Sequence, residues 1–429
     1  MRAPSVPASR PGQQAPLPPT ASTRKPRLLV LTSTFPRWRD DNQPPFVFEL
    51  SRRLTNDFDI TVLAPRAPGS LDREEMDGLH IVRFAYFIRR WENLATHGGG
   101  ILNRLQVNPL NYLLLPLFLT GQLRALLGLL RRGNYDLIHA HWLIPQGLLA
   151  VVARRLVRCD AALVCTSHGG DLFALRGALL RRLKIGVMRN SRMITVVSTV
   201  MRKQVLRMNI ARDQVEVIPM GVDLQQRFTP DPNQPRSNMD LLFVGRLVEK
   251  KGVQTMLHAL PRVISRYPEV RLTIAGSGPL EQRLRQLARD LGIAHCVRFL
   301  GQIAQADLPR LYRQAALFIA PFQIADSGDQ EGLGLVLVEA MSCGCCVLCG
   351  AVPATADAIT DGITGACFAP GDPEALAEKI IALLADPHLR ARLADNGRAH
   401  CRKAFDWEHI ATRYRRVLMR SLAPVTATP

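Results

Sequence analysis

Residues 241–276, LLFVGRLVEKKGVQTMLHALPRVISRYPEVRLTIAG, show most clearly the pattern from which we predict the fold. An aliphatic run at 241–246 is followed by a helix-length segment at 253–266 and by a second aliphatic run at 270–276. Strands that are buried on both faces and separated by helices are typical of parallel sheets, because parallel neighbours need a crossover connection. The stretch therefore predicts one β–α–β unit of a parallel sheet.

The same alternation covers most of the chain and restarts once, after the polar, proline-rich segment TPDPNQPRSN at 229–238, which is typical of a linker. Strands are expected at 27–33, 58–64, 79–85, 135–141, 162–167, 215–220, 241–246, 270–276, 297–301, 316–321 and 345–349. A helix expected at 372–386 begins with Asp372-Pro373, a capping residue followed by proline in the first turn. We predict two facing Rossmann-like, doubly wound α/β domains with a cleft between the carboxyl ends of their strands.

The chain divides into four expected segments. A disordered tail, with seven prolines, occupies residues 1–26 and precedes an N-terminal domain at 27–225. A second domain follows at 226–405, and residues 406–429 form a C-terminal helix and tail that packs back on the N-terminal domain.

The net charge of +19 is concentrated in the first half of the chain. Residues 1–220 hold 31 Lys and Arg against 15 Asp and Glu, whereas residues 221–429 hold 24 against 21. A general preference for Arg would raise the charge throughout, so the imbalance favours an anionic partner for the first half. A membrane surface, a lipid phosphate, an acidic glycan and nucleic acid all fit this charge.

The nine cysteines are an odd number, and no secretory pattern accompanies them, which indicates a reducing cytoplasm. Four of them lie in CGCCVLC at 343–349, which matches a helix end, a glycine and a strand. Small buried side chains are therefore favoured there over a metal or Fe–S site. The longest strongly apolar run, Leu113–Leu119, is far below the roughly 20 residues that span a bilayer.

Two blocks carry the chemistry. In DSGDQEGLGLVLVEAMSCG at 326–344, Glu331 precedes a glycine-rich turn and Glu339 lies on the helix that follows. Such a turn lets backbone N–H groups approach a phosphate, and the helix N-terminus adds partial positive charge. Glu339 is surrounded by apolar residues, so its carboxylate needs a partner or a ligand. In FVGRLVEKKGV at 243–253, Arg246 and Lys251 follow a strand and suit a diphosphate, with Lys250 as a competitor for that role.

Together with TIAGSGP at 273–279 and Ala-Met-x-Cys-Gly at 340–344, these blocks resemble the family-four glycosyltransferases. The resemblance runs from about Arg27 to Arg420. It implies the GT-B fold, an acceptor-binding first domain and a second domain that binds a nucleotide sugar. Glu331 would contact the donor sugar, Glu339 the ribose, and Arg246 and Lys251 the diphosphate. Further donor contacts would come from Gly332, Leu333, Gly334, Leu335, Gly276 and Gly278.

The first half departs more from the family. Asp40 and Asn42 stand in a loop where many members have a glycine pair, and Pro353-Ala354 replaces another glycine pair in the second half. In TSHGGDLF at 166–173, His168 would lie near the transferred sugar. Asp171 is a further candidate for this loop, and His141, in HAHWLIPQG at 139–147, would border the acceptor or pack in the core.

The resemblance implies a retaining hexosyltransferase that uses a nucleoside diphosphate sugar and a glycan or lipid-linked acceptor, with no metal and no cofactor. The alternatives are a nucleotide-sugar epimerase, a sugar phosphorylase and a basic protein that binds nucleic acid; the last would leave both glutamates and both cations unexplained. The apolar run at 113–119 and the arginines near it would either dock a cytoplasmic enzyme on the inner face of an anionic membrane or belong to a core helix.

Overall fold

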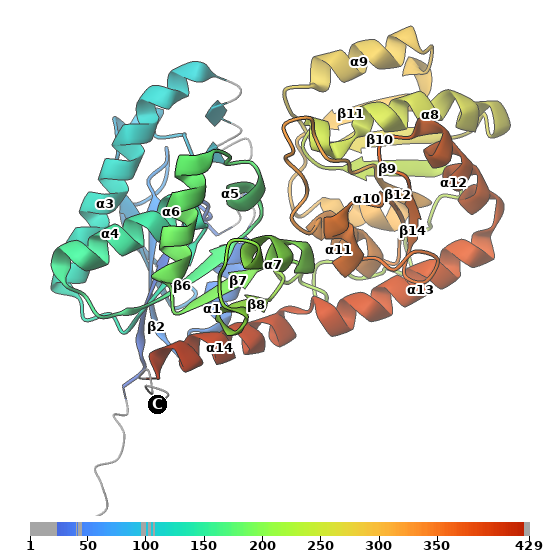
Figure 1. Ribbon diagram of the computed structural model, residues 1–429. Helices are drawn as coiled ribbons and strands as arrows, with labels where there is room; N and C mark the ends of the chain where they lie inside the picture. The colour runs from blue at the N-terminus through green and yellow to red at the C-terminus, as the bar shows by residue number, and fades with distance from the viewer. Residues whose placement is uncertain are drawn as a thin grey trace, which may run out of the picture.

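The computed structural model describes residues 24–39, 41, 45–95, 100–101, 104–105 and 108–423. These form two α/β domains that face each other, each built on its own sheet (Figure 1). Of the tail expected at 1–26, only residues 24–26 are described, and Arg24 pairs with Asp136 at 3.2 Å.

The N-terminal domain contains an eight-stranded sheet in the order β3-β4-β2-β1-β5-β6-β7-β8, parallel except for β3. Its strands are β1 (Arg27–Leu31), β2 (Asp59–Pro65), β3 (Arg73–Met76), β4 (Leu79–Phe84), β5 (Leu137–His141), β6 (Ala162–Ser167), β7 (Met193–Val196) and β8 (Val215–Val217). Its helices are α1 (Phe46–Arg53), α3 (Leu114–Arg132), α4 (Leu148–Val157), α5 (Gly170–Phe173), α6 (Ala178–Arg189) and α7 (Thr199–Leu206). Helices α3, α4 and α6 pack side by side over one face of this sheet (Figure 1).

The C-terminal domain contains a six-stranded parallel sheet in the order β11-β10-β9-β12-β13-β14. Its strands are β9 (Asp240–Val244), β10 (Arg271–Ala275), β11 (Val297–Gly301), β12 (Leu317–Ala320), β13 (Cys346–Gly350) and β14 (Ala366–Phe368). Its helices are α8 (Val253–Arg266), α9 (Glu281–Asp290), α10 (Leu308–Gln314), α11 (Leu335–Ser342), α12 (Pro373–Ala385) and α13 (Pro387–Ala404). The cap expected at Asp372 is confirmed, since its Oδ1 accepts from the backbone N–H of Glu374 and of Ala375, both at 3.0 Å.

The predicted β–α–β unit is confirmed as β9, α8 and β10, whose strands pair in parallel. The three strands that the sequence did not predict are β3, β7 and β14, each of three or four residues. Of these, β3 has the sequence REEM, whose charged residues give no hydrophobic pattern to recognise.

The order of each sheet reverses direction once, between β1 and β5 in the first and between β9 and β12 in the second. At such a switch point, the loops after the two central strands diverge to opposite faces and leave a crevice at the carboxyl ends. His141 is the last residue of β5, and Arg246 lies in the loop that follows β9, so both domains place a predicted site residue at the carboxyl end of a switch-point strand.

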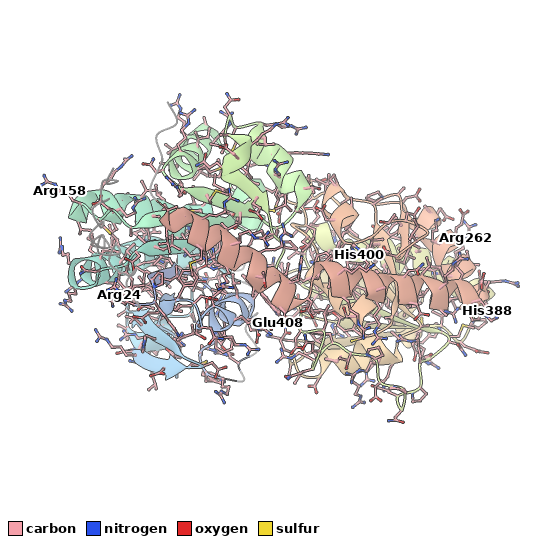
Figure 2. The ribbon with its side chains drawn as sticks, turned by 90° about the horizontal axis from the view of Figure 1, so that it is seen from below. Arg24, Arg158, Arg262, His388, His400 and Glu408 are labelled. Atoms are coloured by element: carbon pink, nitrogen blue, oxygen red, sulfur yellow. The ribbon has the colours of Figure 1, made fainter. Side chains whose placement is uncertain are left out.

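The chain crosses back at its end. Helix α14 (Trp407–Leu422) follows α13 and packs against α1, β5 and β6 of the N-terminal domain. Figure 2, seen from below, shows α13 running under the C-terminal domain from His388 past His400, and α14 continuing from Glu408 under the other domain. The chain therefore joins the two domains twice, once between β8 and β9 and once between α13 and α14.

Buried contacts anchor α14. The Tyr414 side chain is fully buried, and its hydroxyl donates to the backbone oxygen of Ile218 at 3.4 Å. The Trp407 indole packs against Gly221, where a Cβ would lie only 2.5 Å from the ring. Arg415 pairs with Asp57 at 2.7 Å. The helix is thus part of the N-terminal core.

One expectation about apolar length is wrong. Residues Pro109–Arg132, a 3-10 turn followed by α3, form a helix of 24 residues. Its most apolar window has a mean hydropathy of 1.7, which would suffice to cross a membrane by length and composition alone. The longest uninterrupted apolar run underestimated this segment, because isolated Thr, Gly and Gln residues interrupt a run but lower the mean hydropathy only slightly. Only 22% of this apolar window is buried in the protein.

We predict that α14 is required for stability of the N-terminal domain. Tyr414→Ala should lower the free energy of unfolding by about 3–5 kcal/mol, because it leaves a cavity in the core, and Tyr414→Phe by about 1 kcal/mol, because it removes only the hydroxyl. Arg416→Ala, on the exposed side of the same helix, is the matched control and should change stability by less than about 0.5 kcal/mol. Urea denaturation measures all three, and equal stabilities of Tyr414→Ala and Arg416→Ala would contradict the prediction.

Candidate active site

The two domains touch through backbone at the predicted site. A Cβ placed on Gly332 would lie 2.8 Å from the His168 carbonyl oxygen, and one on Gly169 would lie 3.1 Å from the Gly332 Cα. A side chain at Gly332 would clash with the other domain, and one at Gly169 would be tightly packed and strained by its φ of +106°. The loop after β6 and the turn before α11 therefore meet directly, and His168 of the first domain lies beside the Glu331–Gly332 segment of the second.

A largely buried ion pair lies next to this contact. Lys251 Nζ is 2.7 Å from Glu331 Oε2, and the ammonium also lies 4.3 Å from the centre of the Phe322 ring. Burial alone would raise the pKa of Glu331, but Lys251, Lys250 and Arg246 outweigh it and lower the pKa to about 2. Burial lowers the pKa of Lys251, while Glu331 opposes that shift. The sugar-binding and phosphate-binding candidates are thus paired with each other.

The two neighbouring lysines have different partners. Lys250 Nζ lies 3.1 Å from a carboxylate oxygen of Asp329 and donates to the Gln330 carbonyl oxygen at 3.2 Å. Lys250 therefore fastens the loop that precedes Glu331, whereas Lys251 reaches Glu331 itself. The sequence left this choice open, and it depends on the 3-10 turn Glu249–Lys251, which directs the two side chains differently.

Glu339 has a protein partner that the sequence did not reveal. The Tyr312 hydroxyl on α10 donates to Glu339 Oε2 at 2.9 Å, and Tyr312 itself is fully buried. Burial raises the pKa of Glu339 to about 7, although the Tyr312 hydroxyl and more distant cations oppose the shift. The only sequence signal for this partner was a tyrosine on the apolar side of the short helix LPRLYRQ.

The glycines of the second domain allow close backbone approach. Gly334 has a φ of +85° immediately before α11, so the turn Gly332–Leu335 delivers the chain into the helix start, where the first N–H groups have no intrahelical acceptor. A Cβ on Gly276 would lie 1.9 Å from the Gly245 carbonyl oxygen, and one on Gly278 would lie 2.5 Å from that of Leu247. These two glycines hold the loop after β10 against the loop that carries Arg246.

Three histidines stack behind the domain contact. His141 Nδ1 lies 3.0 Å from His168 Nε2, and the rings are nearly parallel with centroids 5.2 Å apart; the His139 ring follows at 4.3 Å. His139 and His141 are buried, whereas His168 is only partly so. Burial lowers the pKa of His168 and of His139 to about 3, so both rings are neutral at physiological pH.

Two candidates for the acceptor side have other roles. His141 is fully buried and lies behind His168, so it does not border the cleft. Both carboxylate oxygens of Asp171 are engaged: Oδ2 accepts from the Leu143 N–H at 2.6 Å and Oδ1 from the Ser167 hydroxyl at 2.7 Å. Asp171 therefore joins the loops after β5 and β6. Sequence position placed both residues near the site, but only packing shows which way they face.

Two aromatic residues lie beside His168. The sequence did not identify Phe46 as a site residue, and it named Trp142 only as an alternative to His141. Phe46, at the start of α1, lies 4.8 Å from the His168 ring, and Trp142 lies 4.9 Å from it on another side. Trp142, which the sequence named beside His141 as a candidate, is partly exposed where His141 is not. Aromatic rings of this kind suit the apolar faces of a sugar.

Other predicted features are placed as follows. Asp40 and Asn42 lie outside the described residues. Pro353-Ala354 begins a 3-10 turn, Pro353–Asp357, whose Asp357 accepts from the backbone N–H of Thr199 at 2.6 Å and so ties it to α7 of the other domain. Within the described ranges, no three His, Cys, Asp or Glu side chains gather as a metal site would require. The cysteines of the 343–349 run are buried.

Comparison with known proteins supports the resemblance. Residues 45–226 match the model for Glycosyltransferase Family 4, and residues 225–400 match that for Glycosyl transferases group 1. The D-inositol 3-phosphate glycosyltransferase of Frankia alni is 34% identical over 319 residues, which cover 68% of this chain and 76% of that protein. A GDP-mannose-dependent alpha-(1-6)-phosphatidylinositol monomannoside mannosyltransferase of Mycolicibacterium smegmatis is 28% identical over 412 residues, 91% of this chain and 98% of that one.

Solved structures confirm the fold. Sucrose-phosphate synthase from Thermosynechococcus elongatus superposes with a TM-score of 0.75 at 22% identity, covering 92% of this chain and 99% of that one. HepE from Anabaena in complex with UDP gives a TM-score of 0.69 at 18% identity and covers 92% and 100% of the two chains. The predicted GT-B architecture is confirmed, and the chain belongs to the family-four glycosyltransferases.

Proposed function

We propose that this glycosyltransferase moves a hexose from a nucleoside diphosphate sugar to a glycan or lipid-linked acceptor, with retention of configuration at the sugar. The observation that carries the proposal is the Lys251–Glu331 ion pair beside the contact between His168 and Gly332. The Lys251 ammonium, proposed to bind the diphosphate, and the Glu331 carboxylate, proposed to bind the sugar hydroxyls, are thereby held within hydrogen-bond distance of each other, where the two domains meet.

The proposed donor lies along the second domain. Its ribose hydroxyls would donate to Glu339, its diphosphate would lie between the start of α11 and the cations Arg246 and Lys251, and its sugar would reach Glu331. Two positive side chains and a helix N-terminus would stabilise charge on the leaving diphosphate, which is the work that a metal ion does in other transferases. We therefore propose catalysis without a metal or cofactor.

The proposed chemistry is substitution on one face of the sugar. Of the carboxylates that the sequence places at the site, the three in the described part of the chain are engaged: Glu331 by Lys251, Glu339 by Tyr312 and Asp171 by Ser167. None of these groups is held ready as a nucleophile for the anomeric carbon. The bond from that carbon to the diphosphate oxygen would break, the acceptor oxygen would bond on the same face, and its proton would pass to the departing diphosphate.

The names of the relatives support the substrate classes without choosing among them. One relative is named for GDP-mannose and a phosphatidylinositol mannoside, and a structural neighbour was solved with UDP-glucose.

All nine cysteines of this chain are free thiols, even Cys349 and Cys367, whose sulfurs are 3.7 Å apart. Free thiols this close support the proposed cytoplasmic location.

A screen of nucleotide sugars tests the proposal. UDP-, GDP- and ADP-sugars are compared, and we expect those of one base to raise the melting temperature of the protein by a few degrees. A ligand that binds only the folded state stabilises that state. The other two bases serve as controls of equal charge. If none of them changed the melting temperature while nucleic acid bound tightly, the basic first half would have a different role and the proposal would fail.

We predict that Lys251 and Lys250 differ in their effect on turnover. Lys251→Ala should lower kcat by about 10²–10³-fold, because it removes charge stabilisation from the leaving diphosphate. Lys250→Ala is the matched control and should cost less than about tenfold, because its ammonium binds the loop rather than the proposed diphosphate. Product formation is measured in excess EDTA with the donor found in the screen. Equal losses in the two variants, or near-normal turnover of Lys251→Ala, would contradict this assignment.

We also predict that nucleotide affinity depends on pH through Glu339. Ribose hydroxyls that donate to its carboxylate favour the charged form, so affinity is complete above the pKa of about 7 and falls as the pH drops through it. The loss approaches about tenfold per pH unit below that value. Calorimetric titration with the nucleoside diphosphate should show this dependence in the wild type but not in Glu339→Gln. Because the phosphate of the ligand titrates equally in both titrations, identical pH profiles would exclude Glu339 as the ribose acceptor.

A further inference from the structure

Large apolar side chains are exposed together at one end of the N-terminal domain. They come from the loop after β4 and from the turn that leads into α3, whose first turns project at the top of Figure 1. We call this the α3 surface, and its apolar members, with their exposed fractions, are Phe87 (41%), Ile88 (56%), Trp91 (55%), Leu110 (71%), Tyr112 (57%), Leu113 (73%) and Leu117 (39%).

The two segments form one surface. Phe118 of α3 packs edge-on against Tyr86, with ring centroids 5.2 Å apart. Farther out, the Asn111 side-chain amide donates to the backbone oxygen of Arg104 at 2.8 Å, and Arg104 Nε donates to that of Asn93 at 3.3 Å. The loop after β4 and the start of α3 are therefore held side by side.

A buried carboxylate holds the exposed loop in its conformation. Glu92 is fully buried and accepts from the backbone N–H of Tyr86 at 2.6 Å and of Phe87 at 3.0 Å, and it also pairs with Arg66. The Tyr86 hydroxyl accepts from the Leu94 N–H at 3.0 Å. A buried polar network thus holds the apolar side chains at 87–91 at the surface. Their exposure to water is unfavourable, and a partner that covered them would remove this cost.

The geometry of α3 excludes a bilayer-spanning role in this fold. Phe118, Gln122, Leu126 and Leu130 recur every four residues and are buried against the domain. One side of α3 belongs to the hydrophobic core of the N-terminal domain, so the helix could cross a bilayer only if the domain unfolded. The opposite side carries Leu113 and Leu117 at its start and basic residues farther along, as helices that lie in the plane of a membrane do.

The charge around the α3 surface points to its partner. The chain has no Asp or Glu between Glu92 and Asp136, whereas four arginines fall in that interval. Arg124, Arg131 and Arg132 of α3 are exposed, and so is Arg90 beside Trp91. An apolar surface with arginines and with Trp and Tyr among its members matches the interface of an anionic bilayer, where aromatic rings reside at headgroup level and arginines attract acidic lipids.

We propose that the α3 surface docks this enzyme on an anionic lipid bilayer, with α3 lying in the plane of the headgroups and its arginines on lipid phosphates. The inference does not depend on the proposed donor or reaction. It brings the first domain, rather than the nucleotide-binding domain, to the membrane.

Vesicle flotation tests the proposal. The full chain should float with vesicles of phosphatidylcholine and phosphatidylglycerol, and much less with phosphatidylcholine alone. Leu110→Ser/Leu113→Ser should weaken partitioning by about tenfold or more, because it removes apolar side chains from the interface. Ile363→Ser, which changes a 55% exposed residue of the other domain, is the matched control and should bind as the wild type does. Raising NaCl from about 0.05 to about 0.5 M should weaken binding, because salt screens the arginines.

Three outcomes would overturn the proposal: a wild type that does not float, equal flotation of Leu110→Ser/Leu113→Ser and the wild type, or equal binding to neutral and anionic vesicles. A dimer in solution that Leu110→Ser/Leu113→Ser dissociates, without vesicle binding, would identify the α3 surface as a contact between copies instead. The melting temperature and the nucleotide-induced thermal shift of each variant are measured in parallel. They report on folding and on the donor site, so failure of membrane docking is distinguishable from failure of the proposed function.

Discussion

The site depends on the close approach of two backbones, at Gly332 and at His168–Gly169. No side chain fits between them, so the carboxyl ends of the two sheets meet without an intervening layer. This contact brings His168 from one domain beside Glu331 from the other. The Lys251–Glu331 pair, the glycine-rich turn before α11 and the Phe46 and Trp142 rings beside His168 are all arranged around that point.

The contact between the domains is supported from below by the return of the chain. Helix α14 buries Tyr414 and Trp407 in the N-terminal domain while α13 remains part of the C-terminal one. The His139 ring lies 5.8 Å from that of Tyr414, so the histidine stack extends from the domain contact to this helix. The element that links the domains therefore also packs behind the site residue His168.

Some polar groups near the site hold neighbouring loops in place. Asp171 spends both oxygens on neighbouring loops, and Lys184 donates to three backbone oxygens, those of Asp171, Leu172 and Leu175. Such groups shape the loop that presents His168. Glu331 and Glu339 also have partners, yet both are only partly buried. This exposure fits the donor contacts proposed for them.

The amino-acid sequence was enough to predict the two parallel sheets and the glycosyltransferase family, because these depend on local hydrophobic period and on motifs within one segment. It also indicated a basic first half. The folded structure was needed to show which lysine meets Glu331, that Tyr312 donates to Glu339, and that His141 and Asp171 face inward. Those outcomes depend on side chains that come from separate segments, between 27 and 80 residues apart, and no local pattern records which way two distant side chains turn. The exposure of the start of α3 could not be predicted from the sequence either. Whether an apolar helix lies in the core or at the surface depends on what packs against it.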